Sequence, residues 1–495
     1  AVLPVCVSLS RFSGDLWECI QAAVNEAGQL NLAREQVEAL IRQNECLIMF
    51  DDLSELGPYQ EEGLRALESF AAIHNQHGFV FTCRTCEYRN ELQIDTAIEI
   101  RQPSAKGILT RFTAELGDRD GDELYRRVIS DDQLTQLACS PLFIDMMVDL
   151  SRQGSLPRNR GQLLQEFVTR LLWREAAKHD IPASTRERAL TRLGLEMQIE
   201  EKRQYPEDRV RACFTSLIRE WDEPVHWREL LKALRADDLL REKSSRWFYR
   251  HAAFQHYFAA VGALDKPQPV LRNLGDDWWN PVVLFLVGIV QDPNDLIAEI
   301  AEVDSLLAYQ ALNACERERV TADTQRALAH RVSAEIQPVF IDETPREVFD
   351  ALVGIGRYAV QPLLQACAED ETDALLDLTS EILSAMDESV LEILAAALES
   401  SSAPVRRSAA YLLGEIGDDE VVPYLIEAVR DTSPETAAEA IRSLGKLGDR
   451  RAMKPLAEAA RADDRSTWEG ASLRRLAQVA IRQVETRQEY YRREL

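Results

Sequence analysis

The sequence predicts a mainly α-helical fold with an N-terminal α/β part and a C-terminal α-solenoid. Short apolar runs alternate with helical patterns over residues 1–103, and helical patterns dominate from residue 104 onward. Near the C-terminus a segment recurs with Gly414 and Gly445 at equivalent positions, 31 residues apart. Strands that alternate with helices are typical of α/β folds, and a short period of paired helices is typical of stacked repeats.

Charge and cysteine content restrict the classes of partner and compartment. The 495 residues include 57 basic and 83 acidic side chains, and the net charge of -26 repels phosphate backbones, so general nucleic-acid binding is not expected. The nine cysteines are scattered and odd in number, which predicts reduced thiols and a cytoplasmic protein. The longest apolar run, residues 281–290, is about half as long as a membrane-spanning helix, so no membrane contact is expected.

The pattern along the chain predicts five domains. Residues 1–103 hold three apolar runs suited to strands of a buried parallel sheet, "LPVCVSL", "CLIMF" and "GFVFTC". A helical domain (104–155), a winged-helix domain (156–262) and a helical linker domain (263–345) precede the repeats in 346–495. The winged helix is predicted from the order of a helix, a polar turn between "LL" and the aromatic run "RWFY", and a further helix.

The repeats in residues 346–495 predict a solenoid of paired helices. Gly417 and Gly448 share the spacing of Gly414 and Gly445, and each glycine-rich turn is expected to end one helix of a pair. Stacked repeats bury their apolar faces against their neighbours. The predicted core residues are Leu412, Leu413, Ile416, Leu425, Ile426, Leu444, Leu447 and Leu456. The exposed inner helices are expected to form a concave surface that recognises a partner; a purely structural spacer is the alternative.

The stretch "LIMFDDLSEL" places acid at the end of an apolar strand. In P-loop NTPases an aspartate at a strand tip holds Mg²⁺ through water, and a nearby glutamate polarises the attacking water. Asp51 and Glu55 fit these two roles. A strand that ends in a solvated acidic turn is the alternative interpretation.

The segments "LPVCVSL", "LIMFDDLSEL", "FTCRTCEYRN", "ACSPLFIDMM" and "FYRHAAFQHYFAA" together resemble the NACHT family of signal-transduction ATPases. They occur in the family's order, and the resemblance covers about residues 1–262. The family commonly reads D-G-L-D-E where this chain has Asp51 to Glu55. Asp52 and Ser54 depart from that pattern, and these departures concern hydrolysis more than fold.

The resemblance implies roles for three further residues. Arg84 matches the sensor arginine beside the γ-phosphate, and Pro141 matches the proline that packs on adenine. His251 matches the winged-helix histidine that reaches the β-phosphate of bound ADP. Each has a plain structural alternative: a surface arginine, a helix-starting proline and a structural histidine.

The glycine-rich phosphate loop of such an ATPase does not occur in the chain. No G-x-x-x-x-G-K-[ST] motif is found, and that loop supplies most phosphate contacts. In the family it precedes the strand "LPVCVSL", with which this chain opens. We therefore expect a fragment whose P-loop lies upstream and which binds ATP or ADP with Mg²⁺ only together with that loop. A degenerate domain that has lost nucleotide binding is the alternative.

Two other patterns suggest ligands. His74, His77, Cys83 and Cys86 give H-x2-H-x5-C-x2-C, a possible zinc site, although the central gap is short and an apolar strand fills it. A winged helix also binds DNA in some proteins. We expect the intramolecular clamp over ADP that the resemblance implies, because the chain is acidic.

Two functions from different classes follow. The resemblance implies an ATPase switch, with ADP holding a closed state, a ligand sensed by the repeats, and ATP exchange that opens the protein for oligomerisation through its NACHT domain. HEAT repeats joined to NACHT domains are typical of prokaryotic signalling and defence proteins. The alternative is a non-catalytic scaffold, since the repeats also resemble the HEAT-like units of phycobilin-lyase-type proteins, which mainly bind other proteins. Whether the chain is an enzyme is left open.

Overall fold

The computed structural model describes most of the chain. Residues 1, 10, 11, 29, 52, 54, 55, 57–59, 84–91, 93–95, 97, 99, 100, 153–155, 175–180, 222, 223, 244, 337–344, 371, 372, 387, 388 and 495 lie outside the description. The chain forms two compact units, residues 1–102 and 103–495, each of which is described by itself. The division lies beside residue 103, at which the sequence analysis ends the α/β part.

The first unit contains a parallel sheet with the order β1 (Leu3–Ser8), β2 (Cys46–Asp51) and β3 (Gly78–Phe81). The central strand β2 pairs with both neighbours. The helices of this unit are α1 (Leu16–Gly28), α2 (Arg34–Gln43) and α3 (Gln60–Ile73). Parallel strands need crossover connections, and helices provide them here.

Burial along β2 corrects one expectation. The sequence analysis predicts strands buried on both faces, but Ile48 and Phe50 are fully buried whereas Leu47, which precedes Ile48, is 36% exposed. The buried side of β2 packs with Phe70 of α3, whose ring meets that of Phe50 edge-on at 6.1 Å. An unbroken apolar run therefore does not prove that both faces are covered.

The second unit begins with helices that lead to a mixed module. They are α4 (Ala105–Leu116), α5 (Asp118–Ile129), α6 (Asp132–Leu137), α7 (Pro141–Ser151) and α8 (Arg160–Arg174). The module follows as α9 (Ala183–Ile199), β4 (Tyr205–Pro206), α10 (Glu207–Trp221), α11 (Trp227–Ala236), β5 (Leu240–Lys243), β6 (Arg246–Tyr249) and α12 (Ala252–Ala263). Its antiparallel sheet has the order β4–β6–β5. This succession of helices ahead of a hairpin is typical of a winged helix.

A buried ion pair ties the mixed module together. Arg186 of α9 and Asp237 beside α11 are 0% exposed in their side chains, and Arg186 donates to both carboxylate oxygens at 2.5 Å. The same guanidinium donates to the carbonyl of Leu172 at 2.7 Å. A buried charge is tolerated only with such partners, so this pair fixes how α9 packs against the end of α11.

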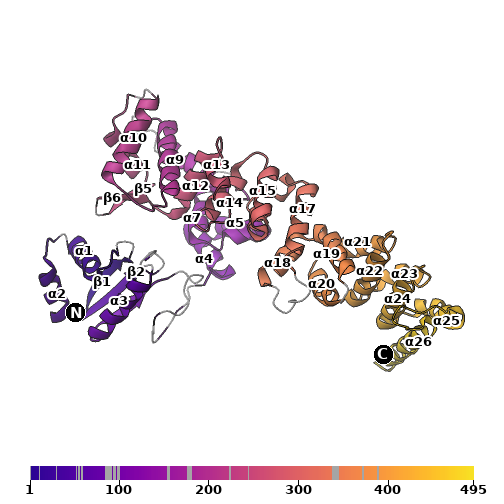
Figure 1. Ribbon diagram of the computed structural model, residues 1–495. Helices are drawn as coiled ribbons and strands as arrows, with labels where there is room; N and C mark the ends of the chain where they lie inside the picture. Colours follow the sequence, from indigo (N-terminus) through magenta and orange to yellow (C-terminus); the bar gives the residue numbers. More distant parts are fainter. Residues whose placement is uncertain are drawn as a thin grey trace. The chain divides into compact units, whose positions relative to one another are not determined.

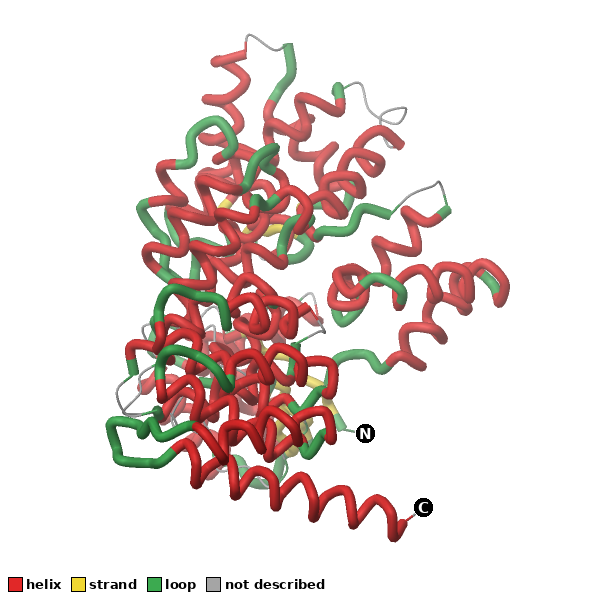
Figure 2. Tube along the Cα trace, turned by 90° about the vertical axis from the view of Figure 1, so that its right-hand side faces the viewer, coloured by secondary structure: helices red, strands yellow, loops and turns green. Residues whose placement is uncertain are grey.

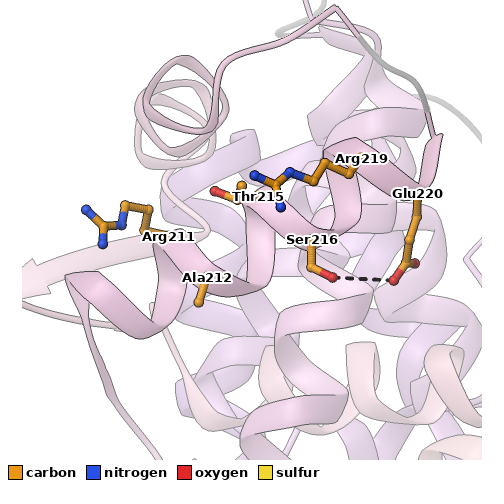
Figure 3. A pocket seen from close by; sticks show the side chains of 6 residues that line it. All are labelled: Arg211, Ala212, Thr215, Ser216, Arg219 and Glu220. Carbon is orange, nitrogen blue, oxygen red and sulfur yellow. Dashed lines mark hydrogen bonds between the residues drawn. The ribbon is translucent and has the colours of Figure 1, made fainter.

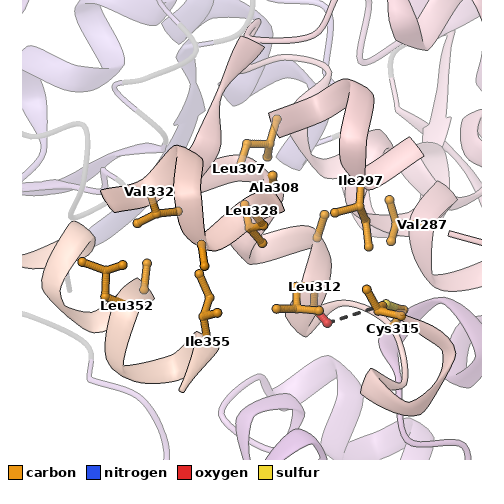
Figure 4. Packing of buried hydrophobic residues seen from close by; sticks show 14 of the residues in the cluster. Val287, Ile297, Leu307, Ala308, Leu312, Cys315, Leu328, Val332, Leu352 and Ile355 are labelled. Atoms are coloured by element: carbon orange, nitrogen blue, oxygen red, sulfur yellow. Dashed lines mark hydrogen bonds between the residues drawn. The ribbon is translucent and has the colours of Figure 1, made fainter. Parts of the chain in front are cut away.

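The helices that follow the mixed module pack against those of the repeats. The next helices are α13 (Gln268–Leu271), α14 (Asn280–Ile289), α15 (Asn294–Val303), α16 (Ser305–Asn313), the 3₁₀ turn η4 (Arg317–Arg319) and α17 (Ala322–Ser333). Figure 4 shows Ile297, Leu312 and Leu328 of these helices converging with Leu352 and Ile355 of the first repeat helix. The linker and the repeats thus share one hydrophobic core.

The C-terminal region is a succession of short paired helices. They are α18 (Arg346–Ile355), α19 (Arg357–Glu369), α20 (Ala374–Ser384), α21 (Ser389–Ala397), α22 (Ala403–Ile416), η6 (Asp419–Val421), α23 (Val422–Ala428), α24 (Pro434–Leu447), η7 (Arg450–Ala452), α25 (Met453–Ala462) and α26 (Leu473–Glu494). The helix α26 has 22 residues and runs to the C-terminal end seen in Figure 2. Helix α24 packs between α22 and α26.

Most predicted core residues of the repeats are buried. Leu412, Leu413, Leu425, Leu444, Leu447 and Leu456 are at most 7% exposed. Ile416 and Ile426 are partly buried and pack against the same core. The prediction is confirmed, because the apolar residues recur at the period at which helices stack.

The recurring glycines have two different physical roles. Gly417 and Gly448 have φ of 82° and 72°, the left-handed conformation that ends a helix and that glycine adopts without strain. Gly414 faces Ser443 of α24 so closely that a Cβ there would lie 2.9 Å from the Ser443 Cα atom. At this contact the Ser443 hydroxyl donates to the carbonyl of Ala410 at 2.8 Å.

Candidate functional site

Asp51 ends β2 at the carboxyl edge of the sheet. Its side chain is exposed, and its Oδ1 accepts a hydrogen bond of 2.8 Å from the Thr82 hydroxyl. Thr82 directly follows β3, so the ends of two neighbouring strands meet here. Open α/β sheets bind ligands at this edge, and an exposed carboxylate is a suitable partner for a hydrated Mg²⁺.

Two predicted site residues of the first unit lie outside the described residues. These are Glu55, predicted to polarise water, and Arg84, predicted to contact the γ-phosphate. Their roles stay predictions. Sequence reasoning missed Thr82, which positions Asp51, because only the pairing of β2 with β3 brings the two residues together.

Pro141 and His251 belong to the second unit. Pro141 is the first residue of α7 and is exposed, a position that suits a helix-starting proline as well as an adenine contact. His251 precedes α12 as its N-cap, and its Nδ1 accepts a hydrogen bond of 3.1 Å from the backbone N–H of Ala253. Since Asp51 lies in the other unit, the predicted convergence of Asp51, Pro141 and His251 stays a prediction.

The surroundings of His251 favour a neutral imidazole. Desolvation of the ring, followed by the positive charges of Arg250 and Arg203, lowers the pKa of His251 below its ordinary value. With Nδ1 accepting from Ala253, Nε2 carries the proton and is a hydrogen-bond donor. Arg203 packs over the Trp278 ring at 4.0 Å, with one guanidinium nitrogen 2.5 Å from His256 Nε2. A neutral donor beside two cations is suited to an anion, and Arg203 was not predicted to belong to this site.

The predicted zinc ligands have another use in the first unit. His74 and His77 are 7% exposed, their rings stack at 6.0 Å, and His74 packs on Phe70 at 4.5 Å. Backbone N–H of Cys46 donates to His77 Nδ1 at 3.4 Å. Cys86 lies outside the described residues, and within the described part of the chain no three His, Cys, Asp or Glu side chains are grouped to hold a metal. The two histidines act as aromatic core residues beside the sheet.

A shallow hollow of about 550 Å³ lies along α10. Figure 3 shows its lining, which comes from one helix and includes Arg211, Thr215 and Arg219. Ser216 and Glu220, which also line it, form a hydrogen bond of 3.5 Å in which the Ser216 hydroxyl donates. None of the predicted nucleotide residues lines this hollow, and its open, single-helix wall does not enclose a ligand.

The repeats present an ordered surface of ion pairs and exposed aromatic rings. Arg406 of α22 forms a two-point pair with Asp431 at 2.7 and 2.8 Å, and Arg465 donates to the Asp431 carbonyl at 2.5 Å. These bonds tie successive repeats together. Tyr424 of α23 and Trp468 are 51% and 78% exposed. Large aromatic rings on a rigid surface are typical anchors for protein partners.

Comparison with known proteins identifies part of this surface. Residues 390–477 match the family of HEAT repeats. We call these residues the HEAT segment, and the prediction of HEAT repeats is confirmed for it. No curated protein matches the chain. Among solved structures, the crystal structure of an engineered protein is similar at 14% identity and a TM-score of 0.24, over 77% of this chain and 95% of that one.

The described residues also bear on two expectations from the sequence, on membrane-spanning helices and on cysteines. In this part of the chain, no helix is long and apolar enough to cross a membrane. The cysteines described there are free thiols. A functional proposal rests best on the HEAT segment, because a protein family matches it.

Proposed function

We propose that the chain is a helical-repeat scaffold whose HEAT segment binds a protein partner. The observation that carries this proposal is the match of residues 390–477 to HEAT repeats, which stack into extended binding surfaces. A cytoplasmic location suits this role. The partner's contact area is expected on exposed side chains of α22 to α26.

The packing of the repeats supports a surface that is ordered before the partner arrives. Arg406 and Asp431 are only 13% and 11% exposed in their side chains, so their charge-assisted bonds are shielded from water. Burial alone would raise the pKa of Asp431, but its bonds to Arg406 and Ser433 lower it, which keeps the carboxylate ionised. A surface that is already ordered loses less entropy on binding.

A site-specific cross-linking experiment tests the scaffold. A photoreactive phenylalanine analogue replaces Tyr424 in α23, and in a matched variant it replaces Arg65, which is 75% exposed in α3 of the first unit. Both variants are irradiated inside the cells that produce them. The variant with the analogue at position 424 is expected to form a cross-link to a defined protein to which the variant with the analogue at position 65 does not cross-link. Capture of the same proteins at both positions, or only at Arg65, would contradict the proposal.

A second candidate is the nucleotide-dependent switch that the NACHT resemblance implies. The observation that favours it is the exposed carboxylate of Asp51 at the carboxyl edge of a parallel sheet. The Thr82 hydroxyl holds this carboxylate by a hydrogen bond. In this candidate Asp51 holds Mg²⁺ through water, Glu55 and Arg84 act on the γ-phosphate, and Pro141 and His251 contact ADP. The HEAT segment then senses the partner, and nucleotide exchange shifts the population to an oligomerising state.

The two candidates differ in what Asp51 does. If the chain joined to a P-loop segment acts as a switch, Asp51→Asn should abolish ATP hydrolysis and leave partner capture at Tyr424 unchanged. A scaffold alone predicts that Asp51→Asn and His251→Ala leave both partner binding and oligomeric state as they are. Measurement of ATP turnover and of mass by light scattering separates these outcomes.

A further inference from the structure

The loop between α25 and α26 is a small ordered hairpin, which we call the Trp468 loop (residues 463–472) (Figure 1). Backbone N–H of Thr467 donates to the Ala471 carbonyl at 3.0 Å, and that of Gly470 donates to the Thr467 carbonyl at 2.8 Å. Gly470 has φ of 84°, which permits the tight reversal. The Thr467 hydroxyl is buried with its residue and accepts from the Ala471 N–H at 3.1 Å. The loop therefore has a defined shape without a partner.

This loop presents a tryptophan to solvent. Trp468 is 78% exposed, whereas its backbone N–H donates to Glu435 Oε1 of α24 at 3.0 Å. The backbone is thus anchored while the indole stays exposed to solvent. Burying one such ring contributes more to an interface than almost any other side chain, and an exposed ring on an ordered loop costs little entropy to bury.

The carboxylates beside the loop are held ionised. Burial alone would raise the pKa of Glu435, but its own backbone N–H, the Ser433 hydroxyl and the Trp468 N–H donate to it and lower that pKa. Ser433 Oγ lies 2.9 Å from Glu435 Oε2. Next to Trp468 in the sequence is Glu469, an exposed carboxylate whose charge reaches Arg407 of α22.

Most of the charged groups named around the loop are paired with one another, but two carboxylates beside Trp468 are not. Arg407 pairs with Asp373, and Arg442 pairs with Glu439 at 2.5 Å. Arg465 of the loop pairs with Asp463 at 2.8 Å, and Arg474 of α26 pairs with Asp464 of the loop. Glu435, which accepts from the Trp468 N–H, and Glu469, which follows Trp468, form no ion pair within 4 Å among the described residues.

We infer that the Trp468 loop binds an arginine-bearing segment of a partner protein, with a guanidinium stacked on the indole and paired with Glu469 and Glu435. This inference rests on the proposed scaffold function and names the chemistry of its partner. A guanidinium is planar, stacks on aromatic faces and matches a carboxylate with two donors, which an ammonium group does not. A phosphate-bearing partner is disfavoured, because the unpaired charge beside the ring is negative.

The same stacking occurs inside this protein. Arg188 lies over the Trp221 ring at 3.5 Å, and Arg203 lies over Trp278 at 4.0 Å. In both cases the arginine comes from a neighbouring segment and covers the indole face. Trp468 presents an equivalent face without such a cover from the described residues, as its 78% exposure shows.

The test uses the whole chain and a labelled peptide of alternating arginine and glycine, with a lysine–glycine peptide for comparison. Binding is measured by fluorescence anisotropy near physiological salt. Replacing Trp468 by Leu keeps an apolar side chain but removes the aromatic face, so it should weaken arginine-peptide binding about three- to tenfold. Trp468→Phe should weaken it less, and the lysine peptide should bind the parent chain less tightly.

The matched controls separate this site from general attraction to an acidic protein. Tyr424→Leu removes another exposed aromatic ring of the HEAT segment and should change binding less than twofold. Glu469→Gln should weaken binding, and so should Glu435→Gln, which keeps an acceptor oxygen for the Trp468 N–H. Circular dichroism should be unchanged in all five variants, since these side chains lie at the surface.

Two results would overturn the inference. The first is that the parent chain and the Trp468→Leu and Tyr424→Leu variants bind the arginine peptide equally well. The second is that no binding that depends on Trp468 is detected up to about 1 mM peptide, the limit of a weak complex. Failure of the scaffold proposal looks different. If a partner captured at Tyr424 binds the Trp468→Leu variant normally, the scaffold proposal stands and the Trp468 site is rejected. If no partner is captured, the scaffold proposal is rejected whatever the result with the peptide.

Discussion

Replacement of Gly414 by alanine tests the close approach of α22 and α24. A Cβ atom at this position would lie 2.5 Å from Ser443 Cβ and 2.9 Å from its Cα, and the Cα cannot rotate away. The helices must therefore separate or the Ser443 backbone must shift. Gly107 of α4 is the matched control, since a Cβ there would come no closer than 3.5 Å to its neighbours.

Two opposing terms set the size of the effect. Alanine stabilises a helix interior by about 1 kcal/mol relative to glycine. Overpacking a tight contact costs about 1–3 kcal/mol, and here the contact includes backbone. We expect Gly414→Ala to lower the local free energy of unfolding by about 1–2 kcal/mol, whereas Gly107→Ala should raise it by a few tenths to about 1 kcal/mol.

Hydrogen–deuterium exchange reads these effects locally, because amides of α22 and α24 report the opening of those helices. Ser443→Gly removes the side chain that meets the new methyl group, so the double variant should recover about 0.5 kcal/mol or more beyond additivity. If Gly414→Ala protects these amides as well as the parent, or if the two substitutions are additive, the helices do not meet at this glycine.

Three further predictions concern the second unit and the nucleotide. Arg186→Ala removes the cation that pairs with the buried Asp237 and should cost about 3–5 kcal/mol in urea unfolding. Arg235→Ala, at the exposed pair with Glu242, should cost less than about 1 kcal/mol, and equal costs would contradict the buried network. Burial, Arg250 and Arg203 lower the pKa of His251, so the folded state binds its proton less readily than the unfolded state, and stability should fall as pH drops below about 6.5. His251→Asn keeps a helix-capping acceptor and should flatten that pH dependence, and an NMR titration of His251 at or above 6.5 would refute it. Calorimetry should find weak or no ATP binding to this chain, and low-micromolar binding would show that the phosphate loop is not needed.

The sequence reveals the repeats well because their signal is local and periodic. Gly417 and Gly448 end helices in the left-handed conformation, as their spacing predicts, and Leu412 and Leu444 lie in the core. Ile416 is partly buried and differs from its prediction only in degree. Each of these features depends on neighbours about one repeat away.

The candidate sites are less readable, because they depend on contacts between distant residues. Thr82 reaches Asp51 only through the pairing of β2 with β3, and Arg203 reaches the surroundings of His251 through the fold of the mixed module. His74 and His77 have zinc-like spacing, yet their rings pack in the core. The exposure of Trp468 depends on the hairpin bonds of its loop, which composition does not indicate.

The most direct test of the scaffold is a hydrogen-exchange footprint of the partner recovered by cross-linking at Tyr424. Amide exchange is compared for the chain alone and for the chain saturated with that partner. The scaffold predicts protection concentrated in α22 to α26, within and beside residues 390–477. Protection confined to residues 2–83, with exchange in the HEAT segment unchanged, would contradict it.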